Sequence, residues 1–505
     1  MNACKLAFLA LALFAVANIA SAAESPATAS EIAWGTFLGG ADHDLGFRVR
    51  TDYSGNIYLA GNTKSEDFPV TANVHDHTYG GGLWGDVFVS KFAPNGSLLW
   101  STFLGGAEGE YCKDLAVDSA GNVYLAGWTV SSDFPVPGGR DRTYHGGAWG
   151  DVFVAKLDSN GKLVWATYHG GADSERARGI AVTSDGYVYV TGWTSSADFP
   201  AKQALDPTFN GGGSNRSEGG DVILSKFSTD GTLVWSTFLG GSRDEIGNAV
   251  AIHQTPGERG ASGPQVVYVV GDAGSSDFPT PRGFDDSIDG GSDAFLAAFD
   301  GDGALLWATF LGGSSGDWGT DVAIDSHGNP VIAGYTHSPE FPHPDGSAPG
   351  RAASRDAFAA KFDSEGSLTW ATYVGGSKLE RALAITLDAE DRVLVAGETN
   401  SKDMPMVAEG NSHTQNYDAF VSLLDLDGKV LWSSYIGGSL ADAASGIALD
   451  RNGNAYVAGA TASPDFPATG GYRPTHCGEQ DAFLVKLSPQ TQPSASTSTA
   501  DPSAK

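Results

Sequence analysis

The chain has 505 residues, of which 60 are Asp or Glu and 30 are Lys or Arg, so its formal net charge at pH 7 is -30. A charge of this sign argues against nucleic acid or an anionic membrane surface as the main partner, because both are recognised through basic patches. It fits a soluble, exported protein that attracts cations. Glycine contributes 68 residues, mostly at recurring turn positions, which indicates tight turns rather than disorder.

The N-terminus has the pattern of a secretory signal peptide. Residues 1–5 are weakly positive, residues 6–19 are apolar, and residues 20–22 are small. We expect a signal peptide at 1–22, a polar lead-in at 23–31 and no integral membrane segment after cleavage. The predicted location is secreted, periplasmic or cell-surface.

One motif, WSTFLGG, sets the organisation of the chain. Its copies begin 62 to 72 residues apart, at Trp34, Trp100, Trp165, Trp235, Trp307, Trp370 and Trp432. A near-constant period of this kind indicates a repeat architecture rather than separate domains. We expect each Trp to be packed between repeats and each Gly pair to turn the chain toward the next one.

Each repeat contains four short segments rich in Val, Phe, Tyr and Trp, which is typical of strands. In the second full copy they are residues 115–118, 122–127, 151–157 and 163–168. The two intervening Asp- and Gly-containing turns suit type I turns that close on a bulge. The unit is therefore a four-stranded antiparallel meander. Because the Trp strand has no polar face, we expect both faces of each sheet to be buried, as in a β-propeller.

The count of strands predicts how the ring closes. The third strand occurs seven times, but the last copy, from Asp481, has no Trp strand after it, and the first Trp strand, at 34–38, has no third strand before it. We predict that these two pieces pair. The predicted fold is all-β, a seven-bladed β-propeller of four-stranded antiparallel blades at 32–487, closed by the N-terminal strand completing the last blade. The Ser-, Thr- and Pro-rich residues 488–505 are predicted to be disordered. The two cysteines after the signal, Cys112 and Cys477, lie in non-adjacent repeats and are expected to be free thiols.

The repeat resembles a known family. The WSTFLGG strand, the DxxGNxYxAGxTxSxDFP run at 118–135 and the DxFVxKF strand are together similar to the SBBP repeat, a bacterial β-propeller repeat of exported and surface proteins. The departures are local: Met404, Ala298 and Leu423 replace motif residues, and residues 253–265 are an insertion. The resemblance implies the fold and supplies no shared catalytic motif.

Three carboxylates recur at fixed places in every repeat, and in the first they are Asp44, Asp67 and Asp86. A ring of such groups on one face could collect cations. The interpretation we favour is structural, because buried loop amides and Thr or Ser hydroxyls need acceptors. A possible divalent cation site in the first repeat uses an imidazole and carboxylate set, namely His43, Asp44, His75 and His77.

Function is expected where the repeats differ. Aromatic side chains stand at non-repeating positions in the long loops and in the GxT motif, where they could stack on sugars or peptides or simply fill gaps between loops. These candidates are Tyr79, Trp84, Trp128, Tyr144, Trp149 and Trp193.

The leading hypothesis is a secreted, monomeric, non-enzymatic binding or scaffold protein that engages an extracellular glycan, peptide or surface protein. The competing hypothesis is a metal-assisted lyase or hydrolase at the channel mouth. A third rests on the likeness of residues 156–165 to the Trp-bearing turn of pyrroloquinoline-quinone dehydrogenases. Those propellers usually have eight blades and often an adjacent cysteine pair, whereas this sequence predicts seven blades and contains no Cys-Cys pair.

Overall fold

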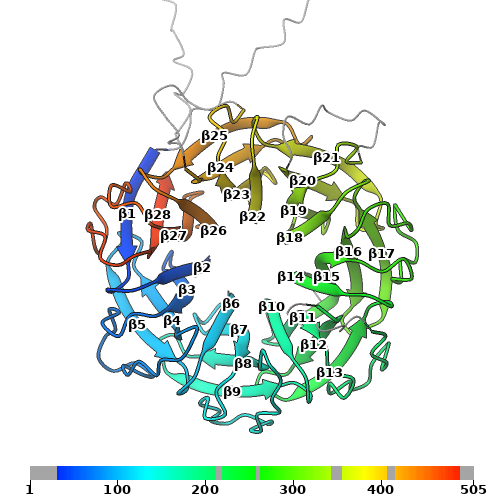
Figure 1. Ribbon diagram of the computed structural model, residues 1–505, viewed down its shortest axis with the longest axis horizontal. Coiled ribbons are helices and arrows are strands. Elements are labelled where there is room, and N and C mark those ends of the chain that lie inside the picture. The colour runs from blue at the N-terminus through cyan, green and yellow to red at the C-terminus, as the bar shows by residue number, and fades with distance from the viewer. Residues whose placement is uncertain (1–30, 212–218, 257–261, 343–354, 406–415, 489–505) are drawn as a thin grey trace, which may run out of the picture.

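The structure is a computed structural model that describes residues 31–211, 219–256, 262–342, 355–405 and 416–488. The predicted signal peptide at 1–22, the lead-in up to residue 30 and the tail from residue 489 lie outside these ranges. The described residues form 28 β-strands arranged in a ring around a central channel (Figure 1).

Seven four-stranded antiparallel sheets make up the ring, which confirms the predicted seven-bladed β-propeller. Six blades use four consecutive strands each, running from the channel to the rim. Their strands are β2 (Asp44–Thr51), β3 (Ile57–Thr63), β4 (Asp86–Phe92) and β5 (Leu98–Leu104) in blade 1; β6 (Glu110–Val117), β7 (Val123–Thr129), β8 (Asp151–Leu157) and β9 (Leu163–His169) in blade 2; β10 (Glu175–Val182), β11 (Val188–Thr194), β12 (Asp221–Phe227) and β13 (Leu233–Leu239) in blade 3; β14 (Glu245–Pro256), β15 (Ser262–Ala273), β16 (Asp293–Asp300) and β17 (Leu305–Leu311) in blade 4; β18 (Asp317–Ile324), β19 (Pro330–Thr336), β20 (Asp356–Phe362) and β21 (Leu368–Val374) in blade 5; and β22 (Glu380–Leu387), β23 (Val393–Thr399), β24 (Asp418–Leu424) and β25 (Val430–Ile436) in blade 6.

Blade 7 closes the ring as predicted. It contains β26 (Asp442–Leu449), β27 (Ala455–Thr461) and β28 (Asp481–Ser488), and β1 (Glu31–Leu38) adds as its outer strand. The register pairs Trp34 with Lys486 and Leu38 with Ala482. The first and the last strand that the structure describes are therefore paired in one sheet.

The inner strands begin earlier than the sequence predicted. In blade 2 the first strand opens at Glu110, not at Leu115. A β-bulge between Cys112 and Asp114 shifts the register there, and an inserted residue breaks the alternation of side chains on which the prediction relied.

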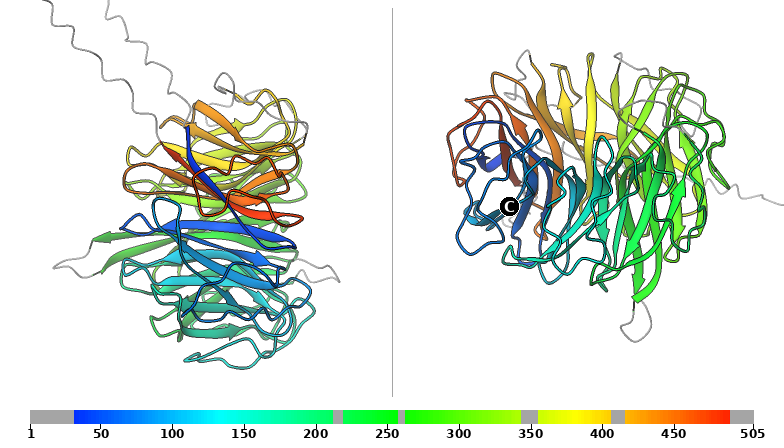
Figure 2. Two further views of the ribbon diagram at one scale, coloured as in Figure 1. Left: turned by 90° about the vertical axis from the view of Figure 1, so that its left-hand side faces the viewer. Right: turned by 60° about the horizontal axis from the view of Figure 1, so that its bottom comes forward.

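The two ends of the ring differ. The connections from β3 to β4 and from β5 to β6, and their equivalents, lie at one end, which we call the loop face. The tight hairpins lie at the other end, the hairpin face. The insertion at 253–265 lengthens the β14–β15 hairpin, which projects beyond its neighbours on the hairpin face (Figure 2).

The repeat Trp residues pack between blades, as predicted. All seven are 3 to 7% exposed. The Nε1 of Trp34, in blade 7, donates to the carbonyl oxygen of Pro94 in blade 1 at 3.2 Å. Trp100 makes the same bond to Ser159 in blade 2 at 3.0 Å. Trp165, Trp235, Trp307 and Trp370 do the same, so six of the seven indoles bond to a turn of the next blade.

The Gly pair lies in the β5–β6 connection, where the chain passes to the next blade as expected. Neither Gly105 nor Gly106 has the positive φ of a glycine turn. Instead, a Cβ on Gly105 would lie 2.6 Å from Glu110 Oε2 and 2.9 Å from Asp86 Cγ. Glycine is needed because the backbone passes between two carboxylates that come from neighbouring blades.

The long β3–β4 connections protect the edges of the sheets. In blade 1, the amide of Thr71 donates to the carbonyl of Ser101 and the amide of Phe103 donates to that of Asp76. The connection therefore runs along the outer strand β5 and pairs with part of its free edge, which would otherwise be a template for aggregation.

Candidate functional site

The repeated carboxylates are structural, as the favoured interpretation predicted. Asp44 Oδ2 accepts hydrogen bonds from the Gly40 amide at 2.7 Å and the Ser65 hydroxyl at 2.8 Å. Asp67 Oδ1 accepts from the Ala41 amide at 2.8 Å. Burial, offset only in part by these bonds, raises the pKa of Asp44 to about 6. These groups hold the loop face together.

The structure does not bring His43, Asp44, His75 and His77 together as a ligand set. His43 Nε2 lies 3.0 Å from Glu479 Oε2. Asp44 Oδ2 accepts hydrogen bonds from Gly40 and Ser65. The amide of His75 donates to the carbonyl of Gly161, in the β8–β9 hairpin, so this part of the loop has descended to the hairpin face. The prediction that these four residues form one metal site is therefore corrected, because they lie apart.

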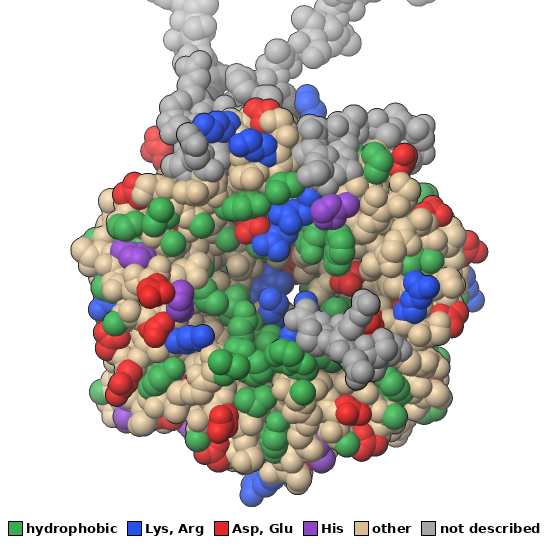
Figure 3. All heavy atoms as spheres, in the orientation of Figure 1, with side chains coloured by type: hydrophobic (Ala, Val, Ile, Leu, Met, Phe, Trp, Pro, Cys, Tyr) green, Lys and Arg blue, Asp and Glu red, His purple; other side chains and the backbone are tan. Residues whose placement is uncertain are grey.

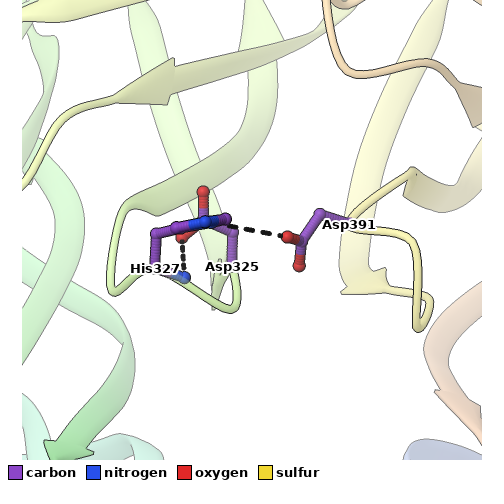
Figure 4. Close-up of side chains that lie close together, drawn as sticks. All are labelled: Asp325, His327 and Asp391. Atoms are coloured by element: carbon purple, nitrogen blue, oxygen red, sulfur yellow. Dashed lines mark hydrogen bonds and ion pairs between the residues drawn. The ribbon is translucent and has the colours of Figure 1, made fainter.

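Within the described ranges, one group of three side chains places possible metal ligands within 4.8 Å of one another: Asp325, His327 and Asp391. It lies on the hairpin face, at two neighbouring turns (Figure 4). Asp325 Oδ1 accepts the amides of His327 and Asn329, and its Oδ2 lies 2.9 Å from Lys361 Nζ. Both carboxylate oxygens of Asp325 therefore already have partners within the protein. The hairpin turn itself accounts for why these three side chains lie together.

The aromatic candidates fall into two sets. Trp128 and Trp193 are 6% and 1% exposed, so they are packing residues. Tyr79 and Tyr144 lie against their own blades, with ring centroids 6.0 Å from Phe103 and Tyr168 respectively. For these four the gap-filling alternative holds.

Trp84 and Trp149 remain partly exposed and form the surface that we call the Trp ledge. Their rings are stacked, with centroids 5.8 Å apart and planes 19° apart. Each comes from a β3–β4-type connection, directly before the Gly-Asp that opens the next strand. Leu83 beside them is 74% exposed. The ledge is thus an apolar surface built by blades 1 and 2.

A continuous stack joins the ledge to the channel. The Arg176 guanidinium lies 4.7 Å from the Trp149 ring and 4.6 Å from the Trp128 ring. Tyr111 is stacked on Trp128 at 4.5 Å, and Phe47 lies 4.9 Å from Tyr111. Alternating aromatic and cationic faces attract one another. The stack crosses blades 1 to 3 and holds Trp149 in place.

At the hub is a cavity of about 340 Å³. Figure 3 looks onto the loop face, where Lys and Arg side chains gather at the central opening and a hydrophobic patch adjoins it over β6 and β7. Every inner strand has a β-bulge at the same place, and each bulge sends one residue into this cavity. We call these seven residues the bulge ring: Phe47, Lys113, Arg178, Asn248, Thr320, Leu383 and Ser445.

Sequence reasoning missed the bulge ring, although a signal was present. Each member is the third residue after the carboxylate that opens the inner strand, and its identity changes from blade to blade. Bulges re-aim side chains and are common beside active sites. A variable position inside a repeated strand is therefore the mark of this site.

Arg48 spans the channel deeper in the ring. From blade 1, its Nη1 reaches Asp321 of blade 5 at 3.1 Å and its Nε lies 3.4 Å from Asp114 of blade 2. Nη1 also donates to the carbonyls of Leu383 and Ser445. Burial lowers the pKa of Arg48, but the charges of Asp321 and Asp114 outweigh burial and raise it. The guanidinium stays charged and cross-links five blades.

Both cysteines that follow the predicted signal peptide are free, as predicted: Cys112 is buried and Cys477 is exposed. Within the described part of the chain, no helix is long and apolar enough to cross a membrane.

Known proteins match parts of this chain. The uncharacterized WD repeat-containing protein L264 of Acanthamoeba polyphaga mimivirus is 23% identical over 388 residues, 68% of this chain and 28% of that protein. The regulatory protein FlaEY of Caulobacter vibrioides is 31% identical over 146 residues, 29% of this chain and 14% of that protein. The chain thus matches less than a third of either relative's length.

Among solved structures, the Neurospora crassa Pan2 WD40 domain has 10% identity and a TM-score of 0.43, covering 92% of this chain and 98% of that one. A gluconolactonase from Xanthomonas campestris has 9% identity and a TM-score of 0.34, covering 92% of this chain and 98% of that one. Scores this low carry no argument.

A model of the SBBP beta-propeller repeat matches residues 99–135, 164–200 and 431–467. Each match begins in an outer strand, crosses the loop face and ends at the Asp-Phe-Pro turn of the following blade. It therefore covers the Trp strand and the run that ends in Asp-Phe-Pro, and the DxFVxKF strand lies outside it. The chain is therefore a β-propeller protein that carries the SBBP repeat.

Proposed function

We propose that this protein is an exported, non-enzymatic binding or scaffold protein whose loop face engages a glycan, a peptide or another surface protein. The main support for this proposal is the Trp ledge. Trp84 and Trp149 present stacked, partly exposed rings, and the stack behind them fixes one of the two. Rigid aromatic side chains contribute large contact area at low cost in conformational entropy.

The ledge is a departure from the repeat, which also supports a role in binding. At the place of Trp84 and Trp149, blades 3, 4, 6 and 7 have Gly219, Gly291, Asn416 and Glu479. The fold therefore does not need an aromatic residue there. The competing hypothesis of a metal-assisted enzyme has no support from the four blade 1 residues proposed as its ligands, because they do not lie together.

The test is a double variant, Trp84→Ala with Trp149→Ala, applied with the wild type to arrays of glycans and of peptides. The matched control is Tyr53→Ala, which removes a 65% exposed aromatic residue from a hairpin-face turn. We expect the wild type and the control to bind the same array features and the ledge variant to lose them. Full binding by the ledge variant, or no wild-type binding to either array, would overturn the proposal.

A further inference from the structure

The loop that carries Trp84 is fastened to blade 1 by a buried carboxylate. Asp86 opens β4 and is 1% exposed. Its Oδ2 accepts the amide of Gly80 at 2.8 Å and its Oδ1 accepts the amide of Gly81 at 3.1 Å. Because these bonds fix the turn that leads into Trp84, the carboxylate helps to place the Trp ledge.

The same loop also packs on blade 2. The carbonyl oxygen of Gly85 accepts the amide of Glu110 at 3.0 Å. A Cβ on Gly109 would lie 3.2 Å from Trp84 Cε3, so the indole lies against the backbone of blade 2, and it is stacked on Trp149 of that blade. The position of Trp84 therefore depends on how closely blades 1 and 2 approach each other at the loop face.

A second buried carboxylate faces Asp86 across this junction. Glu110 is fully buried, and a Cβ on Gly105 would lie 2.6 Å from Glu110 Oε2 and 3.1 Å from Asp86 Oδ1. The two groups thus share one small space. Two negative charges this close, away from water, repel each other strongly. The pair is therefore most stable when it holds one proton and carries one negative charge.

Within the described ranges, no Lys, Arg or His side chain pairs with Asp86 or Glu110 to offset this repulsion. The other titratable groups that face the pair are two carboxyls and two phenols, Asp76, Asp133, Tyr79 and Tyr168. Burial raises the pKa of Asp86 to about 7, and the charges of Glu110 and Asp76 add to this effect. Burial also raises the pKa of Glu110. The pair therefore loses its proton as the pH rises through neutrality.

The equivalent carboxylate in blade 2 has a partner that can carry a positive charge. Asp151 Oδ2 lies 3.3 Å from His145 Nδ1, and in blade 1 the place of His145 is taken by Gly80. A protonated imidazole offsets the charge of Asp151, whereas Asp86 has no such neighbour. Trp84 is therefore the ledge residue whose support depends most on pH.

We propose that the Asp86–Glu110 pair is a pH-dependent switch for the Trp ledge. While the pair holds its proton, blade 2 lies close enough for Trp84 to contact Gly109 and stack on Trp149. When both carboxyls ionise, their repulsion widens the junction and Trp84 loses these contacts. The effect on ligand binding rests on the function proposed for the ledge, whereas the movement of Trp84 does not.

The effect on binding is measured with a glycan or peptide that the wild type binds on the arrays. We expect the apparent affinity to fall about tenfold from about pH 6 to about pH 8, because the fraction of protein with an intact ledge falls from about nine tenths to about one tenth. A wild-type affinity that stays constant would contradict control of binding by the pair. If no array ligand binds, the proposed function fails, and the ligand-free titration below still decides whether the switch exists.

The switch itself is tested by fluorine NMR of the full chain labelled with 5-fluorotryptophan, recorded without ligand from about pH 5 to about pH 9 and assigned by Trp84→Phe and Trp149→Phe variants. We expect the Trp84 resonance to shift in one step with its midpoint at about pH 7, and the seven repeat resonances to move less. A Trp84 resonance that does not move in the wild type would overturn the proposal.

The decisive variant is Glu110→Gln, which keeps the size of the side chain, lets its amide donate to Asp86 and removes one of the two charges. It should abolish most of the Trp84 shift. The matched control is Asp293→Asn, because Asp293 faces Asp317 at the junction of blades 4 and 5 and its loop has Gly291 at the ledge position. The control should keep the full shift. A shift that persists in Glu110→Gln, or one that disappears equally in the control, contradicts the assignment of the switch to this pair.

Discussion

At the scale of single residues, the structure explains the invariant parts of the repeat by space rather than by conformation. The first Gly of the pair is needed because carboxylates of two adjacent blades approach the backbone there, and the second, Gly106, lies against Ser131 and Asp133 of the next blade. Those carboxylates in turn satisfy amides and hydroxyls that folding has removed from water, which is the usual requirement for buried polar groups.

Because the backbone at Gly105 has no room for a side chain, adding a single methyl group there should destabilise the protein. Gly105→Ala places a methyl group against Glu110 and Asp86 and should lower the free energy of unfolding by about 1–3 kcal/mol. Gly291→Ala is the control, because an added Cβ there meets nothing within 4 Å, and it should change stability by less than about 0.5 kcal/mol. Urea denaturation followed by Trp fluorescence measures both. Equal stabilities would show that the backbone does not need the space.

At the scale of elements, the repeated Trp strand is the fastener between blades, and its first copy closes the ring. Trp34→Ala removes a buried indole and should cost about 3–5 kcal/mol. Because β1 is the terminal strand, hydrogen exchange in β1 and β28 should rise more than in other blades. The comparison is Trp307→Ala, in the middle of the chain, which should destabilise similarly without exposing β1. A Trp34→Ala variant as stable as the wild type, or with β1 still protected, would refute this role.

At the scale of elements, the sequence predicts some features of the strands and loops correctly and misses others. The turns, the strand count and the closing pair of Trp34 with the Asp481 strand follow from spacing, because tight turns and a fixed period leave few alternatives. The sequence predicts the start of the inner strand of blade 2 five residues too late, because a β-bulge interrupts the alternation of side chains there. Because Lys113 lies before the predicted start of the strand, the sequence did not indicate that Lys113 and its equivalents face the channel. Spacing also could not tell that the first loop descends to the hairpin face and carries His75 away from His43.

At the scale of the whole molecule, the burial of many carboxylates makes the stability of the fold depend on pH, and each of them shifts the stability in the same direction. Burial raises the pKa of seven loop-face carboxyls into the range from about 6 to about 8: Asp44, Asp86, Glu175, Asp221, Glu245, Asp293 and Asp442. The folded state then holds protons that the unfolded state has released. The stabilising effect is complete below the unfolded pKa values and is lost as the pH rises through the folded ones.

The melting temperature should therefore be higher near about pH 5 than near about pH 8. Glu245→Gln should flatten this dependence and stabilise the protein at the higher pH, because Gln carries no charge to desolvate. Calorimetry across this range at constant ionic strength checks both. A melting temperature that increases from the lower to the higher pH would contradict the sign.

The repeats build the propeller, and we expect binding at exposed residues that depart from the repeat. The twelve Trp residues divide into those of the repeat and those outside it. Seven belong to the repeat, and the other five, Trp84, Trp128, Trp149, Trp193 and Trp318, lie at the ledge, in or beside its stack, or in the cavity wall.

The role of the Trp ledge is measured most directly by fluorine NMR of the full chain labelled with 5-fluorotryptophan, titrated with a glycan or peptide that the wild type binds on the arrays and assigned by Trp84→Phe and Trp149→Phe variants. We predict that the Trp84 and Trp149 resonances shift with ligand, while the seven repeat resonances stay in place. Shifts confined to the repeat Trp residues, or unmoved Trp84 and Trp149 resonances at saturating ligand, would contradict this prediction.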